Sequence, residues 1–242
     1  MRLPVVFIFL TVVLDSMGIG IIVPVMPDLI QEVGNFDLSQ AALWGGTLTV
    51  VFAINQFLFS PALGGLSDAY GRRPVLLVAL FVMALDYLVM ALAQSLWLLF
   101  IGRVVGGITA ATQSTASAYM ADISSKEDKA KNFGLLGAAF GVGFILGPML
   151  GGLLSEYGSR APFYAAAAIA FLNMLFGYFV LPETVTAVNR RKFEWRRANP
   201  VWGVQTNEKA ARSNANAVGV SAAQHCVFRL SRYLGFLWPC AV

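Results

Sequence analysis

Three ionisable side chains lie within long apolar segments of this sequence: Asp15, Asp86 and Arg103. A charge at bilayer depth costs about 3 kcal/mol on insertion scales, so each group needs a partner or a watery cavity. Arg103 is the natural counter-charge for Asp15, and we expect their pairing to depend on whether the carboxylate is ionised. Asp86 lies nearer the outer end of its segment, from which it could also reach the membrane interface.

The chemistry open to Asp15 is proton exchange or substrate contact in a central cavity. The structural alternative is a carboxyl that hydrogen-bonds to a neighbouring helix and holds it in place. Uncharged amides add to a possible substrate path, because Asn55 and Gln56 lie in one apolar segment and Gln113 in another. Such amides serve as interhelical hydrogen-bond donors as often as they contact ligands, so both interpretations stay open.

Enzyme chemistry has little support in the sequence. It contains no recognisable nucleophile–base set or phosphate-binding loop, so we predict that the protein is not an enzyme. His225, Cys226 and Cys240 all lie near the C-terminus, which leaves the apolar part without histidine or cysteine ligands. We therefore expect no metal site, disulfide framework or bound cofactor.

The composition indicates a membrane protein. Of 242 residues, 57% are hydrophobic and only 12% are charged, whereas a soluble domain carries about a quarter charged residues. The net charge of +4 is uneven: residues 1–181 hold 8 Lys and Arg against 10 Asp and Glu, and residues 182–242 hold 9 against 3. The basic excess belongs to the C-terminal part, so nucleic-acid binding by the apolar body is not indicated.

Apolar runs predict an all-α membrane protein with six transmembrane helices, each near the ~20 residues that cross a bilayer. The first is too long for a cleaved signal peptide and contains Asp15. The predicted spans are residues 4–27, 41–63, 75–93, 96–118, 133–154 and 162–181.

Lys and Arg accumulate in alternate loops, which predicts the orientation. With the N-terminus inside, Arg2, Arg72, Arg73 and residues 126–131 face the cytoplasm, whereas the outer loops carry only Arg160. Both ends of the six-helix body are therefore expected to be cytoplasmic.

The chain changes character after Leu181. Residues 182–200 are polar and basic, as expected for a cytoplasmic connector. Residues 201–242 have no sustained helical or alternating period, which predicts a disordered segment or an out-of-frame tail.

The loop between the second and third spans has a distinctive spacing of Gly64, Asp68, Gly71, Arg72 and Arg73. Gly64 is expected to let the helix end, and Gly71 to permit a tight turn. Asp68 can meet the N-terminus of the next helix or either arginine, forming a latch on the cytoplasmic face. The alternative, in which the arginines only anchor the topology, leaves that spacing unexplained.

The fifth span carries glycine at every fourth position, Gly143, Gly147 and Gly151, followed by Gly152. On a helix the first three form one bare stripe that another backbone can approach closely. Pro148 removes a backbone donor and is expected to bend the helix. This pattern suits either a plain packing seam or a helix that rocks against its neighbour.

Together these motifs resemble the major facilitator superfamily. The segment from Gly64 to Arg73 resembles its signature loop, with Ala69 where the family usually has a basic residue. Residues 103–108 resemble the fourth-helix motif of its drug–proton antiporters, and residues 143–152 match the fifth-helix antiporter motif. Residues 14–20 and 85–87 resemble the tetracycline-efflux branch.

The resemblance implies one half of a twelve-helix proton-coupled efflux antiporter in the bacterial inner membrane, with tetracycline as the expected drug. It implies that Asp15, Arg103 and Gln56 line the drug and proton cavity, with Asn55, Gln113 and Asp86 as further candidates. It also implies that the glycine–proline motif packs against the other half, and that the drug travels as a metal chelate.

The motifs extend to about residue 200, which predicts a truncated transporter. Its partners would then be the lipid bilayer, the drug, protons and a missing or separate C-terminal half. Two other interpretations stay open: a non-transporting membrane remnant or interaction protein, and a homodimer of six-helix halves.

Overall fold

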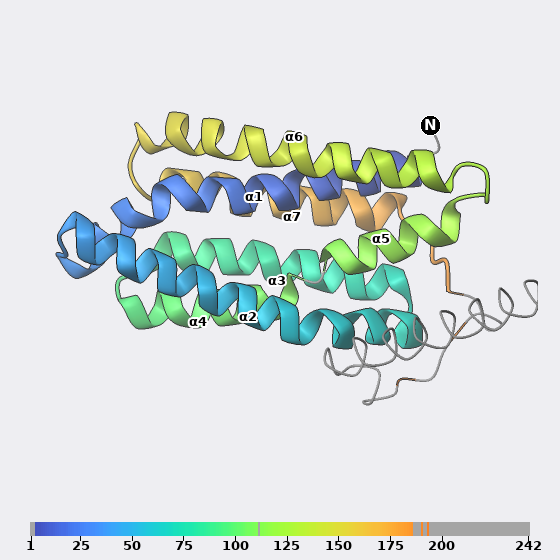
Figure 1. The fold of residues 1–242 in the computed structure, drawn as a ribbon, viewed down its shortest axis with the longest axis horizontal. Helices are drawn as coiled ribbons and strands as arrows, with labels where there is room; N and C mark the ends of the chain where they lie inside the picture. Colours follow the sequence, from blue (N-terminus) through green and yellow to red (C-terminus); the bar gives the residue numbers. More distant parts are fainter. Residues whose placement is uncertain (1–2, 111, 186–189, 191–192, 194–242) are drawn as a thin grey trace, which may run out of the picture. The chain divides into compact units, whose positions relative to one another are not determined.

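The computed structural model describes residues 3–110, 112–185, 190 and 193, and the regular structure in this part of the chain is helical (Figure 1). Six spans are long and apolar enough to cross a membrane, with α4 and α5 together forming the fourth. The prediction of an all-α, six-span body is confirmed, whereas residues 201–242 lie outside the described part. The helices are α1 (Leu3–Gly34), α2 (Leu38–Tyr70), α3 (Arg72–Leu92), α4 (Leu96–Thr109), α5 (Thr112–Ile123), α6 (Lys129–Ser155) and α7 (Ala161–Val180).

The fourth predicted span is present, and it consists of two helices, α4 and α5. Two features weaken the helix where α4 ends. Gly106 and Gly107 have low helix propensity, and the Thr109 hydroxyl donates back to the carbonyls of Val105 (3.0 Å) and Gly106 (3.2 Å). Such back-bonding by threonine competes with the helical ladder and bends helices.

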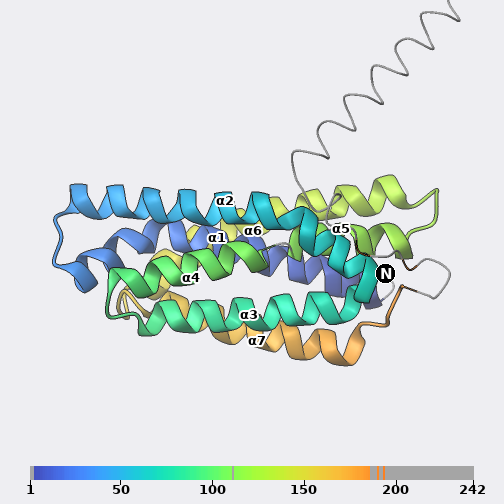
Figure 2. The same ribbon diagram turned by 90° about the horizontal axis from the view of Figure 1, so that it is seen from below.

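The helices run side by side along one long axis (Figures 1 and 2). The main packing pairs are α1 with α6, α3 with α7 and α2 with α4. In the most apolar stretch of α1, 72% of residues are buried, whereas in α2 only 11% are. Helix α1 is therefore the central element, and the apolar side chains of α2 face outward.

Two short turns set the positions of α2. At its start, the Asp37 carboxylate accepts the Gln40 backbone N–H at 2.7 Å and the Ser39 hydroxyl at 2.8 Å. These bonds hold the pKa of Asp37 below its ordinary value, the Gln40 bond contributing most. At its end only Gly71 separates α2 from α3, with a φ of 114° that favours glycine.

The helix does not end at Gly64, which corrects the sequence-based expectation. Gly64 lies inside α2, and the chain turns seven residues later at Gly71. Hydropathy falls at Gly64, but the residues that follow still form a helix, so apolarity alone placed the end too early.

At the opposite end of the bundle, the loop between α6 and α7 is tied to α1 and α3. Arg160 donates from Nε to the Glu32 carboxylate at 3.0 Å and from Nη1 to the Ala91 carbonyl at 2.9 Å. The Ser159 hydroxyl also donates to Glu32. These contacts join three helices through one side chain.

We expect Arg160→Ala to loosen this loop without unfolding the bundle. Partly exposed ion pairs contribute about 0–1 kcal/mol, so amide hydrogen exchange at residues 158–163 should quicken by no more than about fivefold. Glu156→Gln, on the same loop, is the control and should leave exchange unchanged. Equal exchange in Arg160→Ala and the unchanged protein would show that these contacts do not hold the loop.

Candidate functional site

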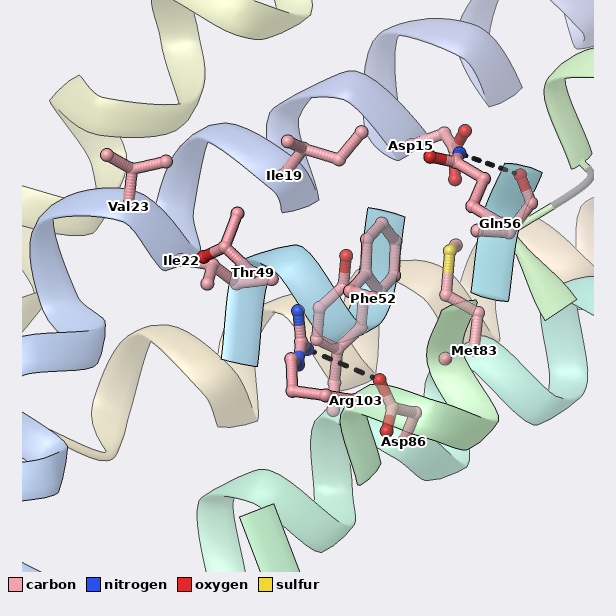
Figure 3. A pocket seen from close by; sticks show the side chains of 13 residues that line it. Asp15, Ile19, Ile22, Val23, Thr49, Phe52, Gln56, Met83, Asp86 and Arg103 are labelled. Atoms are coloured by element: carbon pink, nitrogen blue, oxygen red, sulfur yellow. Dashed lines mark hydrogen bonds and ion pairs between the residues drawn. The ribbon is translucent and has the colours of Figure 1, made fainter. Parts of the chain in front are cut away.

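A cavity of about 60 Å³ opens between α1, α2, α3 and α4 (Figure 3). Of the residues proposed from sequence, Asp15, Gln56, Asp86 and Arg103 line it. Its lining is Asp15, Ile19, Ile22, Val23, Thr49, Phe52, Gln56, Met83, Asp86, Tyr87, Arg103, Gly106 and Ala110. Four segments that are distant in sequence therefore bring carboxyl, amide and guanidinium groups to one space.

Asp86 and Arg103 form a buried ion pair, with 3.4 Å between Oδ2 and Nη2. They are 5% and 3% exposed, respectively. The guanidinium also lies 5.2 Å from the centre of the Phe52 ring and contacts the Met90 sulfur. The two charges compensate each other, as a charge at this depth requires.

This pair corrects the expected pairing, since Arg103 pairs with Asp86 and not with Asp15, and Asp86 is buried. The sequence holds a usable signal for the pair. Asp86 precedes the end of α3 by about two helical turns, and Arg103 follows the start of α4 by the same distance. Two antiparallel helices joined by a short turn place such residues at equal depth.

Glycine makes room for the Asp86 carboxylate. A Cβ on Gly102 would lie 3.0 Å from Asp86 Oδ1, and a Cβ on Gly106 would collide with Oδ2. Across the helix, a Cβ on Gly107 would lie 2.6 Å from the Phe52 carbonyl oxygen of α2. Helix α4 thus packs closely on both neighbours because its glycines lack side chains.

Asp15 lies on α1, buried, and faces the same cavity (Figure 3). Among the described residues no ion pair includes it. Tyr87 lines the same cavity, and its hydroxyl lies directly against Gly18, where an added Cβ would collide. Asp15 is therefore a buried carboxyl without a fixed cation, close to a pair that is already neutralised.

The three amides proposed from sequence separate in the structure. Gln56 lines the cavity and donates from Nε2 to the Ala110 carbonyl at 3.2 Å, at the break between α4 and α5. Asn55 instead donates to the Val51 carbonyl of its own helix at 2.8 Å. Neither Asn55 nor Gln113 is among the residues that line this cavity.

Sequence reasoning missed Thr49, Phe52 and Met83 as lining residues. Thr49, Phe52 and Gln56 are spaced i, i+3 and i+7, and this spacing places all three on one face of α2. Gln56 is a polar residue in an apolar span, and Thr49 and Phe52 share its face of the helix. Periodicity around a known polar position was the available signal.

The turn at Gly71 holds a second charged cluster, consisting of Ser67, Asp68, Arg72 and Asp122 and named here the Arg72 cluster. Arg72 reaches Asp68 at 2.6 Å and Asp122 at 2.7 Å, and it donates to the Ser67 hydroxyl at 3.0 Å. The predicted pairing of Asp68 with an arginine is thus observed. Asp122 was missed, although it ends the span that precedes the next basic loop.

Arg73 is held separately from this cluster. Its Nη2 donates to the Tyr178 carbonyl of α7 at 2.7 Å, and its guanidinium lies 5.6 Å from the centre of the Tyr178 ring. The two adjacent arginines therefore tie α3 to different helices, which a role as topology anchors alone does not explain.

The glycine stripe of α6 packs against α1. A Cβ on Gly147 would lie 2.6 Å from the Met17 carbonyl oxygen and 2.7 Å from the Gly20 Cα, and one on Gly143 would collide with the Val13 carbonyl. Gly151 faces Ile21 in the same way, at 3.2 Å from its carbonyl oxygen. The expectation that these three glycines face a second half is therefore wrong.

Gly152 lies off this stripe, and nothing lies within 4 Å of an added Cβ there. Pro148 contributes to the contact with α1, because its Cδ would lie 2.9 Å from a Cβ on Gly20. The bare stripe and the proline are thus one interlocking surface within the six-helix body.

A body of apolar, membrane-length helices around a cavity lined by ionisable groups is the arrangement of a membrane transport protein. The chain belongs to the Major Facilitator Superfamily, whose sequence model matches residues 8–238. This match continues past residue 200, beyond the motifs recognised in the sequence. The prediction of an out-of-frame segment over residues 201–242 stays a prediction.

Relatives with established names support the same family. The tetracycline resistance protein, class C, of Escherichia coli is 47% identical over 191 residues, covering 79% of this chain and 48% of the relative. The class D protein of Salmonella ordonez is 37% identical over 221 residues, covering 91% and 51%. The chain therefore spans about half the length of the curated relatives it matches.

A solved structure agrees with this relationship. The crystal structure of the human organic anion transporter MFSD10 (TETRAN) is similar with a TM-score of 0.67 and 30% identity, covering 78% of this chain and 49% of that one. The six-helix body thus has the fold of one half of a superfamily transporter.

Proposed function

We propose that this chain is the N-terminal half of a proton-coupled drug antiporter, with tetracycline-like molecules as the exported substrates. The observation that carries the proposal is the buried carboxyl of Asp15, which faces the cavity without a fixed cation. Such a carboxyl can take up and release a proton without breaking an ion pair. The names of the relatives, tetracycline resistance proteins, support the choice of drug.

In this proposal the Asp86–Arg103 pair keeps the cavity polar while contributing no net charge. Proton uptake at Asp15 then changes the charge of the cavity by a full unit, which alters its attraction for a charged drug. Gln56 contributes an amide oxygen, since its Nε2 is occupied by the Ala110 carbonyl.

We place both ends of the six-helix body in the cytoplasm, because basic residues lie at the end of the bundle that contains Gly71. The Arg72 cluster then closes the cytoplasmic end, and rocking of two halves alternates access to the cavity. Asn55 is not proposed as a ligand, nor is Gln113.

The cavity supports the need for a second half. Drug-sized molecules occupy sites of about 300–1,000 Å³, whereas this cavity measures about 60 Å³. We infer that a C-terminal half supplies the other wall. In the absence of such a half, the remnant or interaction-protein interpretation applies, and α2 and α6 present their outward apolar residues to other chains.

The drug is proposed to travel with a divalent metal ion as cargo. In the described part of the chain no group of three metal-ligating side chains occurs. The proposal therefore rests on the resemblance alone, and omission of Mg²⁺ from the transport assay tests it.

The test is co-expression in a drug-sensitive host. The 242-residue chain is produced with and without a separately encoded C-terminal half, and proton-driven tetracycline uptake into inverted vesicles is measured. We expect uptake only when both halves are present. Uptake by the chain alone would contradict the need for a partner, and absence of uptake with the partner would contradict the antiporter proposal.

Asp15→Asn should abolish proton-driven uptake in this assay, because the amide cannot exchange a proton. Asp28→Asn is the matched control, since Asp28 is an exposed carboxylate on the same helix. We expect the control to retain at least about half of the uptake. Full uptake by Asp15→Asn would show that Asp15 does not couple proton entry to drug transport.

A further inference from the structure

The segment that follows α7 returns to the N-terminus of α3. The Glu183 carboxylate accepts the backbone N–H groups of Arg72 at 2.9 Å and Arg73 at 3.3 Å. Its Oε1 also accepts the N–H groups of Thr184 and Val185, both at 3.0 Å. One side chain thus connects the start of the connector to the first turn of α3.

Helix α3 has no local side chain that accepts its first backbone N–H groups. The first N–H groups of a helix have no partner within the helix, and the residue before α3 is Gly71, which has no side-chain oxygen. Glu183 supplies the missing acceptor from 111 residues away. A carboxylate at a helix N-terminus also interacts favourably with the helix dipole.

A second set of bonds links the same segment to α5. The Thr184 hydroxyl donates to Asp122 Oδ2 at 3.3 Å, and Arg72 Nε reaches that same oxygen at 2.7 Å. One step back, the Pro182 carbonyl accepts the Tyr119 hydroxyl at 2.9 Å. Residues 182–184 therefore contact two of the three helices whose side chains form the Arg72 cluster, namely α3 and α5.

Gly71 is what permits this approach. A Cβ on Gly71 would lie 2.5 Å from Glu183 Oε2 and 3.0 Å from its Cδ. The positive φ already favours glycine at this turn, and the carboxylate adds an independent steric reason. The glycine of the loop motif thus serves the turn and the seating of Glu183 together.

We propose that Glu183 is a positioning residue for Arg72, and that residues 182–184 form a clamp that transmits the position of the connector to the Arg72 cluster. The backbone of Arg72 is held by Glu183, and its side-chain partner Asp122 is held by Thr184. The role of the Arg72 cluster as a cytoplasmic gate rests on the proposed function, whereas the clamp itself rests on these contacts.

The test measures the opening of the Arg72 cluster directly. Ser67 is fully buried beneath Arg72, so a cysteine placed there reports access to the cluster. In the full chain with Cys226→Ser and Cys240→Ser, the Ser67→Cys variant is labelled with N-ethylmaleimide in membranes. Ser16→Cys, buried between α1 and α6, reports general loosening of the bundle.

With Glu183→Ala we expect Ser67→Cys to be labelled about tenfold faster. Loss of the charge-assisted hydrogen bonds should shift the equilibrium between the closed and the open cluster by about a factor of ten. Labelling at Ser16→Cys should not change. Glu183→Gln, which keeps an acceptor oxygen, should give an intermediate rate at Ser67→Cys. The Arg72→Ala variant gives the reference rate of Ser67→Cys labelling when the cluster is open.

Two results would overturn the clamp. The first is no acceleration at Ser67→Cys in Glu183→Ala, and the second is equal acceleration at both reporters, which would make Glu183 a general stabiliser. Neither labelling rate requires transport. Failure of the clamp therefore leaves the antiporter proposal intact, and failure of drug uptake with a C-terminal half leaves the clamp intact.

Discussion

Gly147→Ala is expected to destabilise the six-helix body, although alanine favours a helix over glycine by about 1 kcal/mol. The added methyl would lie 2.6 Å from the Met17 carbonyl oxygen and 2.7 Å from the Gly20 Cα. Both are backbone atoms, so no side chain can rotate away and the helices must move apart. Overpacking of this kind costs about 1–3 kcal/mol. Gly147→Leu should separate α1 from α6 altogether.

The control for this prediction lies on the same helix. Nothing lies within 4 Å of an added Cβ at Gly152, so Gly152→Ala should be neutral or slightly stabilising. The measurement is the unfolding free energy in mixed detergent micelles, followed by the loss of helical signal. If both alanine variants were equally stable, the close approach of α6 to α1 would be wrong.

Arg103→Gln is expected to have the second large effect. Removing one partner of a buried ion pair costs about 3–5 kcal/mol, because the remaining charge is left without compensation. Here Asp86 would be stranded in a notch formed by Gly102 and Gly106. The same unfolding assay should therefore show a large loss for Arg103→Gln.

A double variant separates the cost of the stranded charge from the value of the pair. Asp86→Asn combined with Arg103→Gln leaves no charge, so it should recover most of the lost stability. Arg160→Gln, which removes a more exposed arginine, serves as the control and should cost no more than about 1 kcal/mol. Additive losses in the double variant would show that Asp86 and Arg103 are not coupled.

Hydropathy was sufficient to predict the six spans, because bilayer thickness imposes a length that composition reveals. It did not predict the end of α2, which continues as a helix from Gly64 to Tyr70 after the apolar residues stop. The break after α4 was also missed, since it combines weak local propensity with a tertiary bond from Gln56 to Ala110.

The sequence predicted which residues belong to the candidate site better than it predicted which of them pair with each other. Asp15, Asp86 and Arg103 were identified because they are charged residues in apolar segments. Their presence does not reveal the direction in which each side chain projects from its helix. Partner choice depends on depth and rotation, which place Arg103 beside Asp86. Glu183 was missed for a related reason. Its partners are backbone N–H groups, which the residue types in the sequence do not identify.

The contact between α1 and α6 also determines what can move. Because carbonyl oxygens of α1 meet glycines of α6 with no side chains between them, the two helices have no compliant layer and must travel as one rigid unit. Helix α4 meets α2 in the same way, since a Cβ on Gly107 would lie 2.6 Å from the Phe52 carbonyl oxygen. Because α4 ends at Thr109, this contact couples only the first part of the fourth span to α2.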